Sequence, residues 1–366
     1  MSGLFSRLLM FFSCDRMHIF EECCRIGDKK IMKILKKLTA VLLAATLLTG
    51  ASGITGIGTV DTYAASAPAG LKGVWFSFLD WQLYLRGKDQ GSFDAAFSSV
   101  CDTTAAHGLN AIFVHVRSHN DAVYPSAIYP WSSQMLNGAD PGYDPLAEMV
   151  NIAHSKGLQI HAWINPYGYR GGAITGNAAL ANASNIVSGV QEIVNNYGVD
   201  GIHFDDYFPP VGKGEMNSVI SQVHTACANA GKVFGISPQG NLDNVRGSSA
   251  DVDTWLSSGG YVDYLCPQIY WTDRYGAGGN VTMFSNRLAQ FKAIDSAGIP
   301  LYVGLAAYRA GQAVGSDVGW GLSSTNLAEQ RDKALNSGYS GYIVYRYQTL
   351  LSGVAQAELS ALQSRG

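Results

Sequence analysis

Strand-like and helix-like segments alternate along the chain from Leu71 onward. Eight short apolar runs have the length and the residue types of buried strands, at residues 71–78, 111–117, 159–166, 201–208, 233–239, 264–271, 301–308 and 341–347. Between them lie segments with helical periodicity, at residues 93–107, 145–156, 179–197, 219–230, 284–297 and 326–337. Several of these helices end just before a glycine that can cap them, at Gly108, Gly157, Gly231, Gly298 and Gly338.

This alternation predicts a parallel sheet, because parallel neighbours need a crossover of about a dozen residues or more. Eight β/α units in roughly 300 residues favour a closed barrel over an open doubly wound sheet. No G-x-G-x-x-G follows the first strand, which argues against a dinucleotide-binding fold. We therefore predict an α/β fold, a single (βα)8 TIM barrel over residues 66–366, with the long connections at 119–143 and 167–179 above its mouth.

The N-terminal segment has the pattern of a secretory signal. Lysines between positions 29 and 37 precede an apolar run at 38–48, and small residues around Ala64 and Ala65 follow. We expect residues 1–31 to be a spurious upstream extension, because Met32 opens a conventional signal, and residues 32–65 to be the signal peptide. The apolar run is too short to span a bilayer comfortably. The expected location is outside the cell or in its envelope, with no stable membrane insertion after cleavage; an uncleaved signal anchor is the alternative.

Composition narrows the classes of partner. With 47% hydrophobic residues, 14% charged residues and a net charge of -3, the chain has neither a basic patch nor an acidic tail, so we expect no nucleic-acid partner. Beyond the leader, Cys101, Cys227 and Cys266 fall in predicted core elements, which indicates buried free thiols. No C-x-x-C and no paired histidines at ligand spacing occur, so we expect no metal and no cofactor. We expect a monomer.

Polar side chains collect at the ends of the predicted strands. Strand alternation turns one face of each strand toward the barrel interior, and those faces carry Phe113, His115 and Arg117; His161, Trp163 and Asn165; His203 and Asp205; Ser237 and Gln239; and Gln268 and Tyr270. A barrel interior is normally filled with branched apolar side chains, so this collection of polar groups predicts a functional site at the mouth.

Six stretches of the chain resemble one family. They are FVHVRSHNDAVYPSAIYPWS from Phe113, PGYDPLAEMV from Pro141, HSKGLQIHAWINPY from His154, YGVDGIHFDDYF from Tyr197, GISPQG from Gly235 and VDYLCPQIYW from Val262. Together, and in this order, they resemble the glycosyl hydrolase-like 10 (DUF187) family. The resemblance implies a secreted or envelope (βα)8 barrel with glycoside hydrolase activity. Some relatives act on peptidoglycan glycan strands stripped of their peptides.

Glycoside hydrolysis usually needs two carboxyl groups. No glutamate lies at a predicted strand end, so aspartates are the candidates. Asp205 is the first, because it shares the inward face of His203. Its G-x-x-x-D setting also resembles the fourth strand of α-amylase-like barrels, where the aspartate is the nucleophile. Asp206 is the second, either as the acid or as a group that holds Asp205 in place, since adjacent like charges raise one pKa.

Each of these aspartates has a structural alternative, namely capping the next helix or bonding an arginine. Asp121 and Asp80, on the loops after the second and first strands, are further acid candidates. Asp144 is expected to cap the helix that follows it. The fourth-strand pattern of family-18 chitinases fits at Asp200, Gly201 and Asp205, but Tyr207 occupies the place of the proton-donor glutamate. A chitinase is therefore disfavoured, although assistance by an N-acetyl group of the substrate stays open.

The remaining candidates are polar or aromatic side chains that suit sugar hydroxyls and sugar rings. We predict substrate contacts for Arg117, Asp121, His161, Trp163, Asn165, Tyr167, His203, Tyr207, Gln239, Gln268, Tyr270 and Trp271. Arg117 is expected to orient a carboxylate, either of the enzyme or of a lactyl group. For His115 and His161, and for each tryptophan, a place in the barrel core is the alternative.

The sequence thus predicts a secreted glycoside hydrolase that cleaves the O-glycosidic bonds of a polysaccharide, with a cell-wall glycan as the favoured substrate. The alternative is a carbohydrate-binding barrel without catalytic activity, which fits the small number of carboxylates. A metal-dependent deacetylase is disfavoured, because no Asp/His/His ligand set is recognisable.

Overall fold

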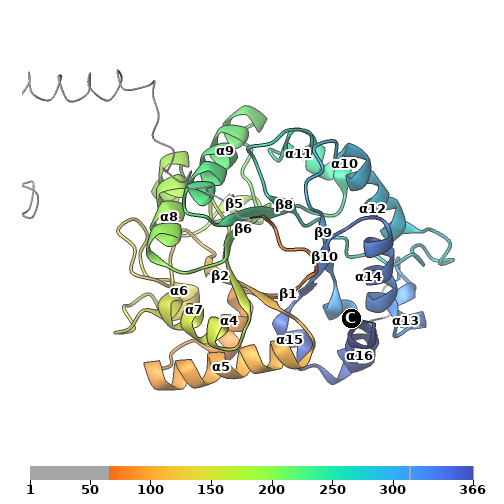
Figure 1. Cartoon of the computed structure of the whole chain (residues 1–366), viewed down its shortest axis with the longest axis horizontal. Coiled ribbons are helices and arrows are strands. Elements are labelled where there is room, and N and C mark those ends of the chain that lie inside the picture. The colour runs from red at the N-terminus through yellow and green to blue at the C-terminus, as the bar shows by residue number, and fades with distance from the viewer. Residues whose placement is uncertain (1–65, 313–314, 366) are drawn as a thin grey trace, which may run out of the picture. The chain divides into compact units, whose positions relative to one another are not determined.

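The computed structural model describes residues 66–312 and 315–365, and a ring of eight parallel strands forms its centre (Figure 1). The strands are β1 (Leu71–Phe76), β2 (Ala111–Arg117), β3 (Gln159–Ile164), β6 (Gly201–Asp205), β7 (Val233–Ser237), β8 (Tyr264–Leu265), β9 (Tyr302–Leu305) and β10 (Gly341–Tyr345). Their order is β8-β7-β6-β3-β2-β1-β10-β9. Isolated parallel bridges from Leu265 to Leu301 and from Gln268 to Gly304 close the ring. The predicted (βα)8 barrel is confirmed.

Helices surround the ring, as Figure 1 shows. The long ones match the six predicted segments: α5 (Gln90–Ala106), α7 (Pro145–Ser155), α8 (Ala183–Asn196), α9 (Lys213–Asn229), α12 (Met283–Ile294) and α14 (Asn326–Asn336). The glycines predicted to follow five of them all have positive φ, between 66° and 81°. Gly108, Gly157, Gly231 and Gly338 directly follow the C-cap residue and take the left-handed conformation that ends a helix at low cost. The prediction is wrong for Gly298, because α12 ends at Ile294 with Asp295 as its C-cap.

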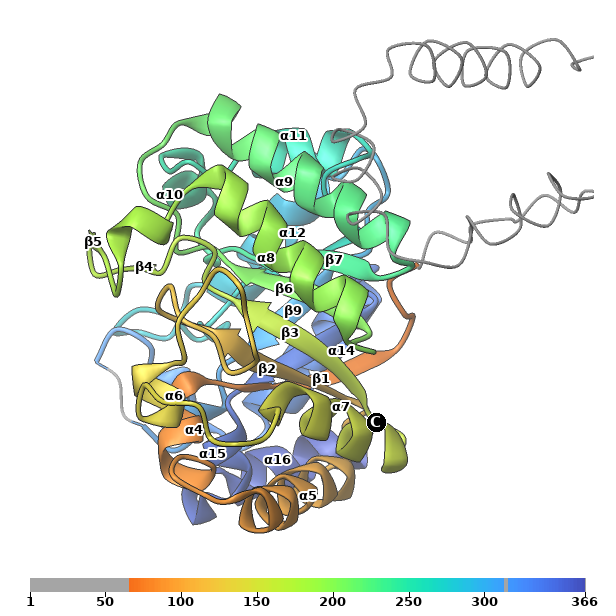
Figure 2. The ribbon, with the colours of Figure 1, turned by 90° about the vertical axis from the view of Figure 1, so that its left-hand side faces the viewer.

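Shorter elements lie in the connections and after the last strand, and they were not predicted. They are α4 (Phe78–Tyr84), α6 (Ser133–Leu136), η2 (Ala178–Leu180), α10 (Leu242–Arg246), α11 (Val252–Ser257), η3 (Ala307–Arg309), α13 (Gly319–Leu322), α15 (Tyr347–Leu350), η4 (Gly353–Ala355) and α16 (Gln356–Ser364). A two-stranded hairpin of β4 (Tyr169–Arg170) and β5 (Ala173–Ile174) follows β3. Figure 2 shows this hairpin beyond the carboxyl ends of the strands.

Aromatic rings fill the barrel interior. Trp75, Phe113, Trp163 and Tyr264 belong to one buried cluster inside the ring. Glycines on the strands make room for them: a Cβ on Gly235 would come within 2.1 Å of the Tyr264 ring. In the interior, large flat side chains therefore pack directly against the backbone of the strand glycines.

The larger hydrophobic core lies between the strands and the helices. It contains Ile112, Val114 and Val116, the residues predicted to face the helices from the second strand. Cys101, Cys227 and Cys266 are buried free thiols, as predicted. Within the described residues, no helix is both long enough and apolar enough to cross a membrane. The predicted extension at 1–31 and the predicted signal peptide at 32–65 lie outside the described residues.

Candidate active site

A cavity of about 150 Å³ opens at the carboxyl end of the barrel, where the sequence analysis predicts the mouth. Asp205 from β6, Trp163 from β3 and Gln268 after β8 line it together with residues from five further segments. The complete lining is Trp75, Ser77, Phe78, His115, Trp163, Arg170, Asp205, Tyr207, Ser237, Gln268, Tyr270 and Tyr345. The parallel strands thus bring side chains that are far apart in the sequence to one place.

Asp205 is the carboxyl group of this cavity. It is 5% exposed at the end of β6. Its Oδ1 accepts hydrogen bonds from the Asp206 backbone N–H at 3.0 Å and from Gln268 Nε2 at 3.0 Å. Gln268 is itself fixed by a second bond from Nε2 to the Ser237 carbonyl oxygen, at 2.9 Å. The side chain of Asp205 is therefore held in one orientation by partners on the neighbouring strands.

Burial, together with the adjacent Asp206, raises the pKa of Asp205 to about 8, against lowering by its hydrogen bonds and by Arg170. Burial also raises the pKa of Asp206, to about 6, while a bond from the Gln239 backbone lowers it. The neighbouring Asp206 adds to the rise at Asp205, which places the pKa of Asp205 above that of Asp206. At neutral pH, Asp205 is thus a carboxylic acid that carries a proton to donate.

Asp206, unlike Asp205, does not line the cavity. Its Oδ2 accepts the backbone N–H of Gln239 at 2.6 Å, which ties the end of β6 to the end of β7. Neither Asp206 nor Gln239 lines the cavity, and the Gln239 side chain bonds Asn244 instead. Asp206 therefore acts on Asp205 through charge and through its own backbone N–H.

His203 lies beneath Asp205 and is fully buried. Trp75 Nε1 donates to His203 Nε2 at 3.1 Å, so the ring proton resides on Nδ1, which lies 2.8 Å from Tyr264 Oη. Burial holds the pKa of His203 well below its usual value. His203 is therefore a neutral link between β1, β6 and the residues of β8, and the described cavity lining does not include it.

His115 is fixed in the same manner at the cavity wall. The Phe78 backbone N–H donates to His115 Nδ1 at 3.1 Å, so Nε2 carries the proton toward Asn165 Oδ1, also at 3.1 Å. Its ring stacks on Trp163 with centroids 3.4 Å apart. Burial again lowers the pKa of His115 well below its usual value. Asn165 thus positions a wall residue from outside the cavity.

Aromatic side chains form the rest of the wall. Tyr270 and Tyr345 lie with ring centroids 6.0 Å apart. Tyr207, at 38% exposure, stands at the rim. Such rings offer flat faces to pyranose sugars, and their hydroxyls offer hydrogen bonds.

Arg117 does not reach the mouth, and the prediction that it faces inward is wrong. Pairing between β2 and β3 shifts register between His115 and Arg117, which interrupts the alternation of side chains. The guanidinium lies 3.6 Å from the centroid of the Tyr129 ring and 3.5 Å, through Nη2, from the Pro166 carbonyl oxygen. A Cβ on Gly189 of α8 would come within 2.7 Å of Arg117 Nη1, so this arginine packs toward a helix outside the ring.

His161 also lies away from the mouth. It pairs with Gly201 at the start of β6, one layer below the Trp163 and His203 pair, and stacks on Phe113 at 4.5 Å. A separate cavity near Asp200 includes it. The inner-barrel alternative is therefore the correct one for His161.

Three other predicted contacts lie outside the cavity lining. Asp121 accepts a bond from Ser132 Oγ at 2.7 Å and holds the 119–143 connection together. Tyr167 is buried, and its carbonyl oxygen accepts Asn120 Nδ2 at 2.9 Å. Trp271 packs near the Arg287 guanidinium, 5.9 Å from its ring.

The remaining acid candidate, Asp80, makes structural contacts. Asp80 accepts Ser77 N–H at 2.8 Å and Gln348 N–H at 3.0 Å, and it pairs with Arg346 at 3.1 Å. Burial raises the pKa of Asp80, and Arg346 opposes that rise. Asp144 caps α7 through the backbone N–H groups of Leu146 and Ala147, as predicted.

The sequence analysis missed Ser77, Phe78, Arg170 and Tyr345 as cavity residues. Phe78 ends the predicted first strand and Tyr345 ends β10, so the strand-end rule applied to every strand would have found them. Arg170 comes from the β4–β5 hairpin, and its only sequence signal is an arginine in the glycine-rich run 168–172 directly after β3.

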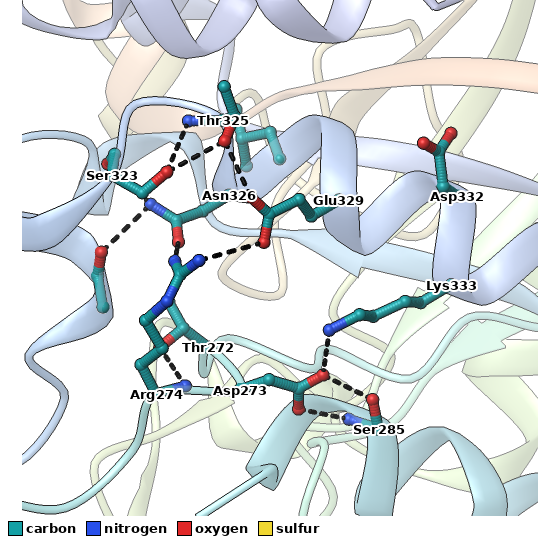
Figure 3. Close-up of polar contacts among 12 residues, drawn as sticks. Thr272, Asp273, Arg274, Ser285, Ser323, Thr325, Asn326, Glu329, Asp332 and Lys333 are labelled. Atoms are coloured by element: carbon teal, nitrogen blue, oxygen red, sulfur yellow. Dashed lines mark hydrogen bonds and ion pairs between the residues drawn. The ribbon is translucent and has the colours of Figure 1, made fainter. Parts of the chain in front are cut away.

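A second polar cluster follows β8 and is shown in Figure 3. Asp273 pairs with Lys333 at 2.6 Å and accepts the backbone N–H of Ser285 at 2.8 Å, while Arg274 pairs with Glu329 at 3.6 Å. A cavity of about 200 Å³ lies beside these groups. Because each of these charges has an opposite charge beside it, the cluster ties α12 and α14 to the loop rather than presenting an open charge.

In the part of the chain that the structure describes, the side chains form no set of metal ligands. No group of three or more His, Cys, Asp or Glu side chains there has a geometry that could hold a metal ion. The cavity at the mouth combines one carboxyl group with aromatic walls and amide and hydroxyl groups.

Comparison with solved structures agrees with the fold. A class V chitinase from Pseudomonas fluorescens Pf-5 superposes with a TM-score of 0.53 over 81% of this chain and 99% of that chain, at 12% identity. This identity is low enough that the likeness extends to the (βα)8 architecture alone.

Comparison of sequences identifies relatives. Glycosyl hydrolase YngK of Bacillus subtilis is 27% identical over 65% of this chain, and the match spans 61% of the Bacillus protein. Glycosyl hydrolase DigH of Escherichia coli K12 is 28% identical over 70% of this chain and 76% of that protein. The sequence profile of the family described as Glycosyl hydrolase-like 10 matches residues 70–178. The resemblance found in the motifs is thereby confirmed: residues 70–178 match the glycosyl hydrolase-like 10 family, and both relatives are named glycosyl hydrolases.

Proposed function

We propose that this protein is a secreted glycoside hydrolase that cleaves a cell-wall glycan, with Asp205 as its proton donor. The family and the fold support glycosidase activity in general. The cell-wall substrate, the secretion and the role of Asp205 are our proposal.

One observation carries the proposal: a buried, hydrogen-bonded carboxyl group lies in a cavity walled by aromatic rings. A glycosidic oxygen is a poor leaving group until it is protonated, and a carboxyl group whose pKa lies above the working pH supplies that proton. Burial gives Asp205 this property by raising its pKa to about 8. The role differs from the nucleophile expected by analogy with α-amylase-like barrels, because a nucleophile must be ionised.

Glycoside hydrolysis usually needs a second reacting group besides the proton donor. Among the cavity residues in the described part of the chain, Asp205 supplies the only carboxyl group. A substrate with a 2-acetamido group removes the need for another, because its carbonyl oxygen can attack the anomeric carbon while Asp205 protonates the departing oxygen. Water then opens the cyclic intermediate, and ionised Asp205 takes up the proton of that water. Sugars of bacterial cell walls that carry N-acetyl groups fit this chemistry.

A carbohydrate-binding barrel without activity is the second candidate. The same single carboxyl group favours it, since most glycoside hydrolases use two. It predicts glycan binding without any product, and this outcome separates it from the enzyme.

The test is product analysis on peptide-stripped peptidoglycan strands and on a panel of other glycans. The wild-type protein should release new reducing ends from an N-acetylated glycan, and Asp205→Asn should lose at least about 100-fold in rate while keeping the fold. Asp243→Asn, on the exposed surface of α10, is the matched control and should retain full activity. Product formation by Asp205→Asn at the wild-type rate would remove Asp205 from the mechanism.

Secretion has its own test. N-terminal sequencing of protein recovered outside the cell should find a start close to Ala65. Retention of the apolar run at 38–48 would contradict signal cleavage and favour the anchored alternative.

A further inference from the structure

Arg170 is a cation at the rim of the cavity with no anionic partner. Its guanidinium carbon lies 4.4 Å from the centroid of the Phe78 ring and 5.4 Å from that of Tyr207. All three side chains line the cavity that contains Asp205. Among the described residues, Arg170 makes neither an ion pair nor a hydrogen bond through its guanidinium.

Two other arginines do have carboxylate partners. Arg346 pairs with the Asp80 carboxylate at 3.1 Å, and Arg246 forms a two-pronged bond to Asp253 at 2.7 and 2.9 Å. When an arginine lies over two aromatic faces, the rings contact the flat face of its guanidinium and leave the N–H edge free to donate hydrogen bonds. That edge is the part that bonds a carboxylate bidentately.

Asp205 does not neutralise Arg170. No ion pair joins the two side chains, and the raised pKa of Asp205 keeps it uncharged at neutral pH. The remaining titratable neighbours, His115 and His119, are held neutral by burial, which lowers the pKa of each. Arg170 therefore places a positive charge at the rim that an anionic group on a ligand would compensate. The Asp206 carboxylate lies outside the cavity lining, where it accepts the Gln239 backbone N–H.

The hairpin that carries Arg170 is anchored. Asn120 Nδ2 donates to the carbonyl oxygens of Tyr167 at 2.9 Å and Thr175 at 3.1 Å, on both sides of the hairpin. Gly168 has a φ of 60°, and a Cβ there would come within 2.8 Å of Asn120, so the close approach requires glycine. Arg170 is thus held over the mouth by the backbone rather than by side-chain pairing.

We propose that Arg170 selects substrates by pairing with a carboxylate on a sugar of the glycan. The inference rests on the proposed function and sharpens it: the preferred chain contains acidic sugars, and the acidic sugar lies beside Phe78 and Tyr207 when Asp205 reaches the glycosidic oxygen. The carboxylate belongs either to the sugar ring, as in a uronic acid, or to an ether-linked substituent.

The test compares glycans that differ only in charge. Peptide-stripped peptidoglycan strands supply an ether-linked carboxylate, and an N-acetylated glycan that contains uronic acid supplies a ring carboxylate. Each is assayed intact and after reduction of its carboxyl groups to alcohols. The wild-type kcat/KM should be at least about 10-fold higher for the intact form of one pair, as expected for a charge-assisted hydrogen bond. The pair that shows the preference identifies the source of the carboxylate.

Variants assign the preference to Arg170. Arg170→Gln should reduce the ratio of kcat/KM values to about one, and Arg170→Lys should leave an intermediate ratio, because lysine keeps the charge but lacks the planar fork. Arg246→Gln removes one positive charge from an exposed pair and should keep the wild-type ratio. A wild-type ratio near one for both pairs, or an unchanged ratio in Arg170→Gln, would overturn the proposal.

Binding measurements separate this proposal from the proposed function. Asp205→Asn, with and without Arg170→Gln, is titrated with the intact and the reduced glycans. If the wild-type protein cleaves nothing but Asp205→Asn still prefers the intact glycan through Arg170, the hydrolase proposal fails and the role of Arg170 stands. If cleavage occurs without any preference for the charged glycan, only the role of Arg170 fails.

Discussion

The chemistry of Asp205 depends on its protonation, and its hydrogen bonds set how far its pKa rises. Burial is the main cause of the rise, while the bond from Gln268 Nε2 at 3.0 Å favours the ionised form and lowers the pKa. Activity that needs the protonated form should therefore fall as the pH rises through about 8.

Replacing Gln268 with leucine removes that donor and should raise the pKa of Asp205 further. We expect the basic limb of the kcat/KM profile to move upward by about one pH unit, the shift expected for one lost hydrogen bond to a charged group. Gln239→Leu is the matched control, because Gln239 acts on Asp206 through its backbone N–H, which leucine keeps. A basic limb that stays in place in Gln268→Leu would contradict the proton-donor role.

The same carboxyl group makes the stability of the fold depend on pH. The reference pKa of an aspartate side chain is 3.8, and the pKa of Asp205 in the fold is about 8. At pH values between these two, the folded state holds a proton that the unfolded chain releases. Stability contributed by this group is fully present below about pH 4 and is lost as the pH rises through about 8. Asp205→Asn removes the titration, so its melting temperature should equal that of the wild type near pH 4 and exceed it by a few degrees above pH 8. A difference that is the same at every pH would show that Asp205 is not buried as a neutral acid.

Sequence pattern located some site residues and failed for others, for identifiable reasons. Alternation placed Asp205, Gln268 and Tyr270 correctly, since β6 and the segment after β8 keep a regular inward face. It failed for Arg117 because the register shift after His115 reverses the direction of the side chain. No periodicity marks such a shift in the sequence.

At the scale of elements, long segments were predictable and short ones were not. The six long helices and most of the strands extend over two or more periods of apolar residues, whereas α6 or α15 has 4 residues and shows no period at all. The β4–β5 hairpin has two residues in each strand and could not be predicted from propensity. That hairpin carries Arg170, so the charge at the rim was invisible from the sequence.

Glycines on the strands should be as important for the barrel as its aromatic rings. Gly235→Ala places a methyl group 2.1 Å from the Tyr264 ring, which is held by the bond to His203, so we expect a loss of about 1–3 kcal/mol in the free energy of unfolding. Gly214→Ala, in an open position on α9 with no atom nearby, should be neutral or slightly stabilising. Urea denaturation compares the two variants. Equal effects would show that the ring and the strand can move apart freely.

At the scale of the whole molecule, the (βα)8 architecture and the resemblance to glycosyl hydrolase-like proteins followed from the sequence, because alternation and motif order extend over most of the chain. The structure adds which residues at the mouth line the cavity and which residues only hold the lining in place. The cavity is lined by one neutral acid, by one cation that has no ion pair among the described residues, and by several aromatic rings. His203, Asp206 and Asn165 lie outside this lining and hold its residues in place through hydrogen bonds. The account of function rests on that single acid.

The most direct test is the release of reducing ends from peptide-stripped peptidoglycan strands by the wild-type protein and by Asp205→Asn near neutral pH. The account predicts soluble fragments from the wild-type protein and a loss of at least about 100-fold in the variant, which still binds the strands. Equal rates for the two proteins, or binding by the wild type with no fragments after prolonged incubation, would contradict it.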